Sequence, residues 1–424
     1  MTIIAQSMWT LEGSDTKMVL HSDANCFYAS VEMVEDPDLR NQRVAVCGDP
    51  EQRHGIVLTA NYPAKRMGVK TGMANWQALQ ACPDLVVVKP HYNLYLKYSK
   101  LLQRIYKRYS NEVESFGMDE CWIGLPYDEE DAVCSAEEIR QAVKDETGLT
   151  VSIGVSFSKA LAKLGSDMKK PDAMTVLGKN DFKEKCWNLP VSDLLYVGPR
   201  TTKKLNGMGV YTIGQLAALP HEVVARKFGK NGLMVQAFAN GTDTSAVAPV
   251  GYSIAPQSIG HGATCTRDLE DNYSVWLALD ELAQDVSHRM IANDCKAQSV
   301  HLFVKDNAFG YHEYVAPIHY PTQSAAVIAQ AAYEHFLSDY RWEKPVRALT
   351  ITATKLQPWN TPVQLDFFGD FLTSDKRNRL DRAVDELRCR FGKDIIKTAC
   401  QCARPTLLAT DKCESVKMPG MMYH

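Results

Sequence analysis

Short β-branched runs and longer amphipathic stretches alternate irregularly along this chain of 424 residues. Val44–Cys47 and Ile56–Thr59 are bounded by Gly, Asp, Asn and Pro, which is typical of strands. Leu94–Tyr109 instead carries apolar residues at helical spacing. A doubly wound parallel sheet would need a regular strand–helix repeat, which the chain lacks. The sequence therefore predicts an α+β fold, and the length allows roughly two to four domains.

Residues 258–356 have the clearest order of predicted elements. A strand (258–266) precedes a helix with apolar residues from Val275 to Met290, and two strands (300–304 and 311–315), a helix (324–337) and a strand (346–356) follow. This β-α-β-β-α-β order predicts a separate compact domain. Residues 241–256 are rich in Thr, Ser, Ala and Pro and indicate a linker. From residue 357 we expect a tail with one amphipathic helix, Leu380–Phe391.

The formal net charge of −3 does not by itself indicate a nucleic-acid-binding protein. Residues 169–240 nevertheless contain eleven basic and five acidic residues, a local excess of six positive charges. No apolar run approaches the roughly 18 residues of a membrane span, and residues 1–17 lack the pattern of a secretory signal. We therefore expect a cytoplasmic protein without membrane attachment, whose twelve cysteines are reduced and mostly buried.

Three acidic residues lie within or next to apolar, strand-like runs. Asp23 follows Met18–Ser22, and Asp119 and Glu120 lie between Phe116 and Trp122. Such acids are costly unless they are paired, hydrogen-bonded or bound to a metal, and hard oxygen ligands suit Mg²⁺. Two ions roughly 3.5–4 Å apart would serve phosphoryl transfer. Adjacent strand residues point to opposite faces, so ordinary acids at a strand edge remain the alternative.

Four motifs carry a resemblance to a known family. His21–Glu32 (HSDANCFYASVE) and Phe116–Glu120 (FGMDE) resemble the two carboxylate motifs of the Y family of translesion DNA polymerases. Thr59–Lys65 (TANYPAK) resembles the stretch that contacts the triphosphate, and Ser158–Pro171 (SKALAKLGSDMKKP) resembles the last motif of the catalytic domain. The order and spacing of all four match, and the similarity runs from about residue 18 to 356. The chain most resembles the bacterial DNA polymerase IV and UmuC-like branches.

The resemblance implies a right-hand polymerase with a ferredoxin-like palm. The implied palm comprises residues 18–26 and 90–177, the small fingers 27–89, and the helical thumb, with a helix-hairpin-helix, 178–243. A linker (244–257) would join the thumb to a little-finger domain (258–356) of β-α-β-β-α-β order. Residues 1–17 would be a leader and residues 357–424 a tail.

The resemblance also implies template-directed DNA synthesis in lesion bypass, with dNTPs added to a primer 3′-hydroxyl. Asp23, Asp119, Glu120 and the Ala24 carbonyl would hold two Mg²⁺ ions. The residues implied at the nucleotide are Tyr28 as the gate that excludes ribonucleotides, its neighbour Phe27, which we expect to pack in the core, and the triphosphate-binding residues Tyr62, Lys65 and Lys170. Taken singly, these tyrosines would be interpreted as half-buried aromatics and these lysines as surface charges.

Two departures from the family pattern concern rate and nucleotide affinity rather than chemistry. Lys65 stands where the family commonly has Arg, and a lysine cannot make the bidentate phosphate contact of a guanidinium. Asn25 stands where many members have a second Asp, so we do not count it as a ligand. A catalytically weak DNA-binding accessory and a nucleotidyl cyclase with a similar palm are the alternatives. The intact carboxylates oppose the first, and the predicted hairpin opposes the second.

Tyr196–Leu205 (YVGPRTTKKL) resembles a helix-hairpin-helix, which binds DNA phosphates through backbone amides. Gly198 would form the turn, and Arg200, Lys203 and Lys204 would add charge; a plain packing hairpin is the alternative. Residues 258–356 hold eight basic and twelve acidic residues, so DNA contact there would require segregated charges such as Arg267 and Arg347. We expect a monomer that binds primer–template DNA.

Gln364–Phe368 (QLDFF) resembles the peptide that binds the bacterial sliding clamp. Gln364 would fix the register, and Leu365, Phe367 and Phe368 would enter an apolar cleft; an anchor that packs the tail is the alternative. Four cysteines also crowd the tail, but they lack paired Cys-x2-Cys spacing. We therefore expect scattered thiols there rather than zinc, at Cys389, Cys400, Cys402 and Cys413.

Overall fold

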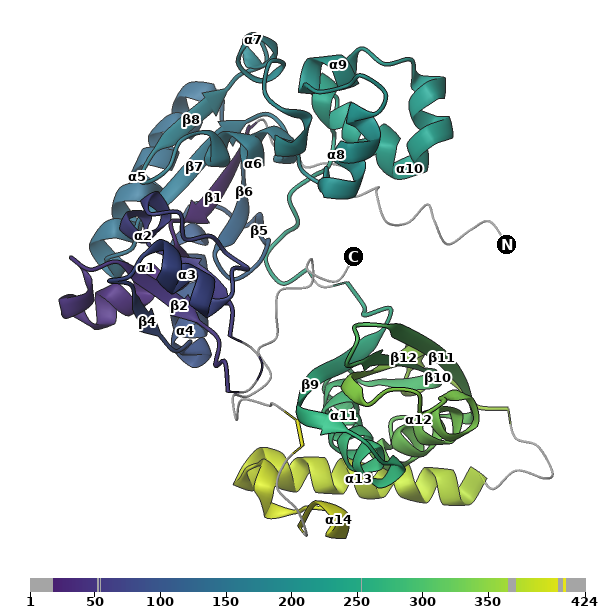
Figure 1. Ribbon diagram of the computed structural model, residues 1–424. Coiled ribbons are helices and arrows are strands. Elements are labelled where there is room, and N and C mark those ends of the chain that lie inside the picture. Colours follow the sequence, from purple (N-terminus) through teal and green to yellow (C-terminus); the bar gives the residue numbers. More distant parts are fainter. Residues whose placement is uncertain are drawn as a thin grey trace. The chain divides into compact units, whose positions relative to one another are not determined.

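The computed structural model describes residues 18–51, 53, 55–252, 254–364, 371–402 and 407–408. Residues 18–48 and 56–252 form one compact unit, and residues 254–364 and 371–402 belong to a second (Figure 1). Both units combine helices with mostly antiparallel sheets, which confirms the predicted α+β fold. The predicted leader, residues 1–17, lies outside the described residues.

A five-stranded sheet with the order β5-β6-β1-β7-β8 forms the centre of the first unit. Its middle strand, β1 (Met18–Ala24), is buried along its whole length and pairs antiparallel with both neighbours. The other strands are β5 (Val113–Ser115), β6 (Glu120–Leu125), β7 (Val151–Ser156) and β8 (Met174–Leu177). Helices α4 (Tyr92–Tyr106), α5 (Glu129–Thr147) and α6 (Lys159–Met168) complete this part.

Helix α6 approaches the sheet closely at a glycine of β7. A Cβ atom at Gly154 would lie 1.9 Å from the Ala162 carbonyl oxygen, so any other residue there would push α6 away. Ser158 caps the start of α6, because its side chain accepts a hydrogen bond from the Leu161 amide. This close packing places the polar residues of α6 beside the end of β1.

Residues 27–88 add a three-stranded sheet with the order β3-β2-β4. Asn61 caps helix α2 (Tyr62–Arg66) and also accepts a hydrogen bond from the Val44 amide at 3.2 Å, which ties the helix to β2. The remaining elements are α1 (Phe27–Glu35), η1 (Pro37–Leu39), β2 (Val44–Cys47), β3 (Val57–Ala60), α3 (Asn75–Ala81) and β4 (Val86–Val88).

Short helices with their own apolar core follow β8. They are α7 (Phe182–Cys186), η2 (Val191–Asp193), α8 (Pro199–Asn206), α9 (Ile213–Ala217) and α10 (His221–Asn240). Residues 241–252 contain no helix or strand. Part of this stretch is nevertheless anchored, because Val247 is buried and the Ala248 amide donates to Glu114 Oε2 at 2.8 Å.

The second unit contains a four-stranded antiparallel sheet with the order β11-β10-β12-β9. The predicted element order is confirmed, although the strands are longer than expected. The elements are β9 (Ile259–Leu269), α11 (Asn272–Ala292), β10 (Cys295–Asp306), β11 (Tyr311–Thr322), α12 (Ala325–Asp339) and β12 (Val346–Pro358). Helices α11 and α12 pack on one face of the sheet and enclose the core (Figure 1).

The region after residue 357, which we expected to be a tail with one helix, contains more regular structure than expected. Helix α13 (Phe371–Phe391) begins nine residues before the predicted helix and contacts α11 and β11. It is followed by η3 (Lys393–Ile395), α14 (Ala399–Cys402) and a bridge between Leu408 and Cys265 of β9. These residues fold onto the second unit through largely polar contacts, which apolar periodicity does not reveal.

Among the described residues, no helix is both long and apolar enough to cross a membrane. Ten cysteines have described side chains; all ten are free, and seven of them are buried, as expected for thiols that fill apolar cores.

Candidate active site

The three predicted carboxylates lie near one another where β1 ends and β6 begins, in the middle of the central sheet. Asp23 of β1 lies opposite Glu120 of β6 in the register of the two strands, and it is 6% exposed. Asp119 precedes β6 in a turn that requires Gly117, whose φ is 101°. The Ala24 amide donates to the Asp119 carbonyl at 3.0 Å, which closes this turn onto β1. Because Asp119 lies outside the strand, the alternation that would separate it from Glu120 does not apply.

Two lysines from α6 and the residues after it neutralise these acids. Lys163 Nζ lies 3.3 Å from Asp23 Oδ2 and 3.0 Å from Glu120 Oε2. Lys170 Nζ lies 2.7 Å from Asp23 Oδ2. Both lysines also pair with Asp167, at 3.1 and 2.9 Å. Sequence reasoning identified Lys170 but missed Lys163, although its position four residues before Asp167 in a helix was a usable signal.

Burial and neighbouring charges shift the pKa values of the three carboxyl groups in different directions. Burial, followed by the charges of Glu120 and Asp23, raises the pKa of Asp119 to about 7. Burial and Glu120 also raise the pKa of Asp23. Burial opposes the ionisation of Glu120 as well, but His21 and Lys163 outweigh it and lower the pKa of Glu120 to about 2.

His21 connects Glu120 to the body of the fold and was missed as a functional residue. Its ring is fully buried, with Nδ1 2.8 Å from Ser166 Oγ and Nε2 3.5 Å from Glu120 Oε2. Burial lowers the pKa of His21. The ring also packs edge-on against Trp122 at 5.4 Å, so its orientation is fixed.

The chemistry of the donor groups at this end of β1 and β6 suits a divalent cation, although the three carboxylates are not gathered into a ready-made ligand cluster among the described residues. The residues there supply three carboxylates and the Ala24 backbone carbonyl, a donor set of hard oxygen atoms, and two of the carboxyl groups have raised pKa values that a nearby cation would reverse. Asn25 is committed elsewhere. Its Oδ1 accepts from Thr150 Oγ1 at 3.0 Å and from the Asp172 amide at 2.8 Å, and its Nδ2 donates to Ser152 Oγ at 2.9 Å.

Apart from Lys170, which follows α6, the predicted nucleotide-binding residues lie on α1 and α2. Tyr28 is half-buried, stacks on Tyr95 at 4.3 Å, and donates to Met118 Sδ at 3.5 Å. Burial and then Asp119 raise the pKa of Tyr28 to about 12, which places it near the carboxylates. Phe27 is 3% exposed and lies in the core, as expected for its packing role.

Tyr62 and Lys65 lie together on α2. The Lys65 ammonium is 5.3 Å from the centre of the Tyr62 ring, and the Lys65 side chain is exposed. The pKa of Tyr62 is raised first by burial and then by Cys26 and Asp23, so this ring lies close to the end of β1. Tyr62 therefore lies near Asp23, and Lys65 lies beside Tyr62.

Gly198 forms the N-cap of α8, with Pro199 at its first position. Arg200, Lys203 and Lys204 are exposed on this helix. The Lys204 ammonium lies 4.6 Å from the centre of the Phe228 ring and donates to the Lys227 carbonyl, which ties it to α10.

In the second unit, Arg267 and Arg347 lie where β9 and β12 shift register. Arg267 is exposed, and the Arg347 guanidinium is 5.3 Å from the centre of the Phe309 ring.

The clamp-like motif falls mainly outside the described residues. Gln364 is described and exposed, whereas Leu365, Asp366, Phe367 and Phe368 are not. Of the tail cysteines, Cys389 and Cys402 are free and exposed, Cys413 lies outside the described residues, and the side chain of Cys400 is also outside them.

Comparison with known proteins assigns the family. Residues 22–167 match the model of the impB/mucB/samB family, and residues 256–367 match its C-terminal domain. Three curated relatives bear the name DNA polymerase IV, alone or with a number. The relative from Acetivibrio thermocellus is 47% identical over 89% of this chain and 95% of its own length. Those from Moorella thermoacetica and Bacillus subtilis are 36% and 34% identical, with 90% and 96% of this chain and 95% and 97% of their own lengths covered.

A solved structure, a Y-family DNA polymerase chimera, shares the fold with a TM-score of 0.72 at 19% identity, over 80% of this chain and 99% of its own. The chain therefore belongs to the impB/mucB/samB family, the Y family of DNA polymerases.

Proposed function

We propose that the chain is a template-directed DNA polymerase of the translesion type, which adds dNTPs to a primer 3′-hydroxyl. The observation that carries this proposal is the convergence of Asp23, Asp119 and Glu120 beside Lys163 and Lys170. The names of its curated relatives support the same activity.

Asp23, Asp119, Glu120 and the Ala24 carbonyl would hold two Mg²⁺ ions. When bound, the ions activate the primer hydroxyl and neutralise charge on the departing pyrophosphate. The chain's own residues prepare the site for them. His21 and Lys163 hold Glu120 ionised, and Lys163 and Lys170 fix the Asp23 carboxylate from one side. The protein performs almost no acid–base chemistry in this type of reaction, so positioning and charge account for the rate.

Lys170, Lys65 and Tyr62 would bind the triphosphate. Lys170 is already oriented at the site by Asp23 and Asp167, and Lys65 is an exposed point charge on α2. Tyr28 would close the sugar site against a ribonucleotide 2′-hydroxyl, and the stacking of its ring on Tyr95 supports this role. Phe27 supports this tyrosine from the core.

Primer–template DNA would be held by residues outside the carboxylate site. Gly198 and the following amides of α8 would bind a backbone phosphate, with Arg200, Lys203 and Lys204 adding charge. Arg267 and Arg347 would contact the DNA backbone from the second unit. The protein would act as a cytoplasmic monomer.

Primer extension tests the activity directly. Asp119→Asn should slow single-dNTP extension by about 100-fold or more, because even residues that only support a metal ligand contribute about 10–100-fold. Asp145→Asn, an exposed acid on α5, is the matched control and should keep wild-type activity. A wild-type protein that binds primer–template DNA without extending it would instead indicate an accessory protein. Full extension by Asp119→Asn would reject the assigned site.

A sliding clamp is the proposed partner of residues 364–368. A peptide that inserts Leu365, Phe367 and Phe368 into an apolar cleft would tether the polymerase to DNA and raise its effective concentration there. In a pulldown on the clamp, Leu365→Ala with Phe367→Ala should lose the partner. Leu380→Ala with Leu387→Ala, which removes two exposed apolar side chains from α13, is the control and should still bind the clamp. Undiminished binding by the first variant contradicts the assignment.

A further inference from the structure

Helix α13 is held on the second unit mainly by polar contacts. Asn378 Oδ1 accepts from Thr322 Oγ1 at 2.6 Å and from the Gln323 amide at 3.1 Å. The Arg382 guanidinium lies 4.1 Å from the centre of the Trp359 ring and pairs with Asp294 at 3.0 Å. The large apolar residues Leu380 and Phe391 are each 62% exposed. Among the described side chains, those of residues 375–391, apolar burial therefore contributes little to the attachment of this helix.

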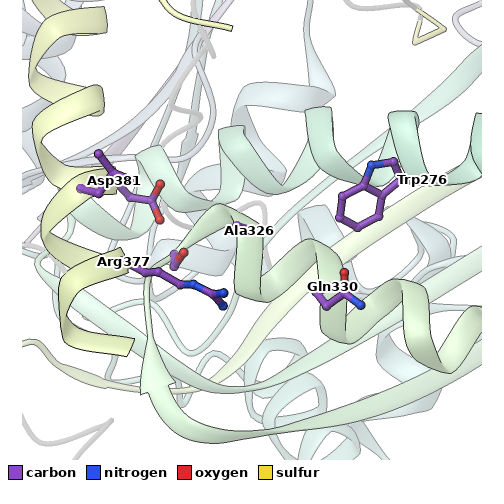
Figure 2. A pocket seen from close by; sticks show the side chains of 7 residues that line it. Trp276, Ala326, Gln330, Arg377 and Asp381 are labelled. Carbon is purple, nitrogen blue, oxygen red and sulfur yellow. The ribbon is translucent and has the colours of Figure 1, made fainter. Parts of the chain in front are cut away.

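A groove beside α13 shows that this helix does not pack closely against α11 and α12 along its whole length. It has a volume of about 370 Å³ and is bounded by α11, α12 and α13. Figure 2 shows Arg377 and Asp381 on α13 facing Ala326 and Gln330 of α12, with Trp276 of α11 further along. An additional link between α13 and α11 would therefore have a clear structural purpose.

Three side chains that can bind metals meet at the contact of these two helices. His288 lies near the end of α11, and Asp385 and Cys389 lie one turn apart on α13. His288 Nδ1 is 2.6 Å from Asp385 Oδ1, and Cys389 Sγ is 3.9 Å from Asp385 Oδ2. One ligand atom from each residue lies within 4.8 Å of the other two. His288 and Asp385 are partly buried, whereas Cys389 is exposed.

We propose that His288, Asp385 and Cys389 form a zinc site that fastens α13 to α11. Imidazole, carboxylate and thiolate are the three protein ligands that Zn²⁺ uses, and the exposed side leaves a fourth position for water. Mg²⁺ and Ca²⁺ prefer sites made only of oxygen, so the thiolate and imidazole select against them. This site is independent of the carboxylates of β1 and β6, and it does not depend on the proposed polymerase activity.

The two ligand separations, which involve different oxygens of Asp385, lie on either side of those of a tetrahedral site. Zinc bond lengths imply separations of roughly 3.3 Å between nitrogen and oxygen and roughly 3.5 Å between oxygen and sulfur. The His288–Asp385 pair, at 2.6 Å, would open slightly when an ion replaces the shared proton, and the Asp385–Cys389 pair, at 3.9 Å, would close slightly. Both changes are within reach of side-chain rotation. Sequence spacing does not reveal this set, because His288 lies 97 residues before Asp385.

Cobalt substitution tests the site in the full-length protein. Metal-free protein, with excess Mg²⁺ to fill sites made of oxygen ligands, is titrated with Co²⁺. We expect a thiolate-to-cobalt charge-transfer band that saturates at one equivalent and disappears when Zn²⁺ is added. Cys389→Ser should abolish the band, and His288→Gln should weaken Co²⁺ binding by more than about tenfold. Cys402→Ser, which removes another exposed cysteine of this region, is the matched control and should keep the band.

Hydrogen exchange measures the attachment of the helix itself. Zn²⁺ should slow amide exchange over residues 375–391 in the wild-type protein and leave the exchange of Cys389→Ser unchanged. Absence of the band in the wild-type protein, or its persistence in Cys389→Ser, would overturn the proposal. Loss of the band in Cys402→Ser would also overturn it, because the thiolate would then come from another part of the chain. In each of these cases His288 and Asp385 form only an ion pair between helices.

Discussion

Asp119 and Glu120 are neighbours in the chain, yet their carboxyl groups have opposite pKa shifts. Both are buried, which favours the protonated form of each. Glu120 alone has His21 and Lys163 beside it, whereas Asp119 mainly experiences the charges of Glu120 and Asp23. The protein itself therefore favours the ionised form of Glu120, whereas a nearby cation would favour that of Asp119, a difference made largely by His21, Asp23 and Lys163.

Tyr28 is expected to exclude ribonucleotides, and changing this one side chain tests that role. Tyr28→Ala removes the ring that stacks on Tyr95, so a ribonucleotide 2′-hydroxyl would find space. Discrimination against ribonucleotides should fall by roughly 10–200-fold, the usual effect of a small group in a pocket. Tyr28→Phe keeps the ring and loses only the weak bond to Met118, so it should discriminate as the wild type does. Single-nucleotide kinetics with dNTP and rNTP measure the ratio, and an unchanged ratio in Tyr28→Ala would exclude it as the gate.

Helix α6 connects several parts of the first unit. Its first residue, Lys159, is 8% exposed, and its ammonium lies 2.7 Å from both carboxylate oxygens of Glu114 on β5. The ammonium also lies 4.4 Å from the centre of the Trp122 ring. Glu114 in turn accepts the Ala248 amide, so one buried pair joins α6, β5 and the stretch after α10. The same helix brings Lys163 to the carboxylate site.

Removing one partner of this buried pair should be strongly destabilising. Lys159→Met leaves the Glu114 carboxylate buried without a cation, which typically costs about 3–5 kcal/mol. Lys159→Met with Glu114→Gln should recover much of this loss, because the amide oxygen can still accept from Ala248. Amide exchange of β5, β6 and α6 under increasing urea measures the stability of this unit. Equal stability of the single and double variants would show that charge is not the cause.

Apolar patterns in the sequence predict the elements that bury apolar side chains. The order of β9, α11, β10, β11, α12 and β12 follows from such patterns, because these elements enclose one core. The extent of α13 does not follow, because its contacts are made by Asn378, Arg382 and Asp385. In the candidate site, the motifs locate the acids, but the turn at Gly117 and the ring of His21 become visible only in three dimensions. A single sequence does not show which residues from distant elements contact one another.

Over the whole molecule, charge is unevenly distributed. The chain has a formal net charge of −3, yet residues 169–240 carry an excess of six positive charges. DNA binding of a protein with this distribution depends on where its cations lie rather than on their total. Arg200 and Lys203 are exposed on α8, directly after the Gly198 turn. These two cations are therefore expected to contribute most to phosphate neutralisation by this helix.

The salt dependence of DNA affinity tests this distribution. Each neutralised phosphate adds about one unit to the slope of log K against log salt, so Arg200→Ala with Lys203→Ala should reduce that slope by about two. Lys100→Ala with Lys107→Ala removes the same charge from exposed positions at α4 and should leave the slope unchanged. Equilibrium binding to primer–template DNA at several salt concentrations gives both slopes. Equal losses in the two variants would mean that net charge alone controls binding, and α8 would then be a packing element rather than a contact for DNA.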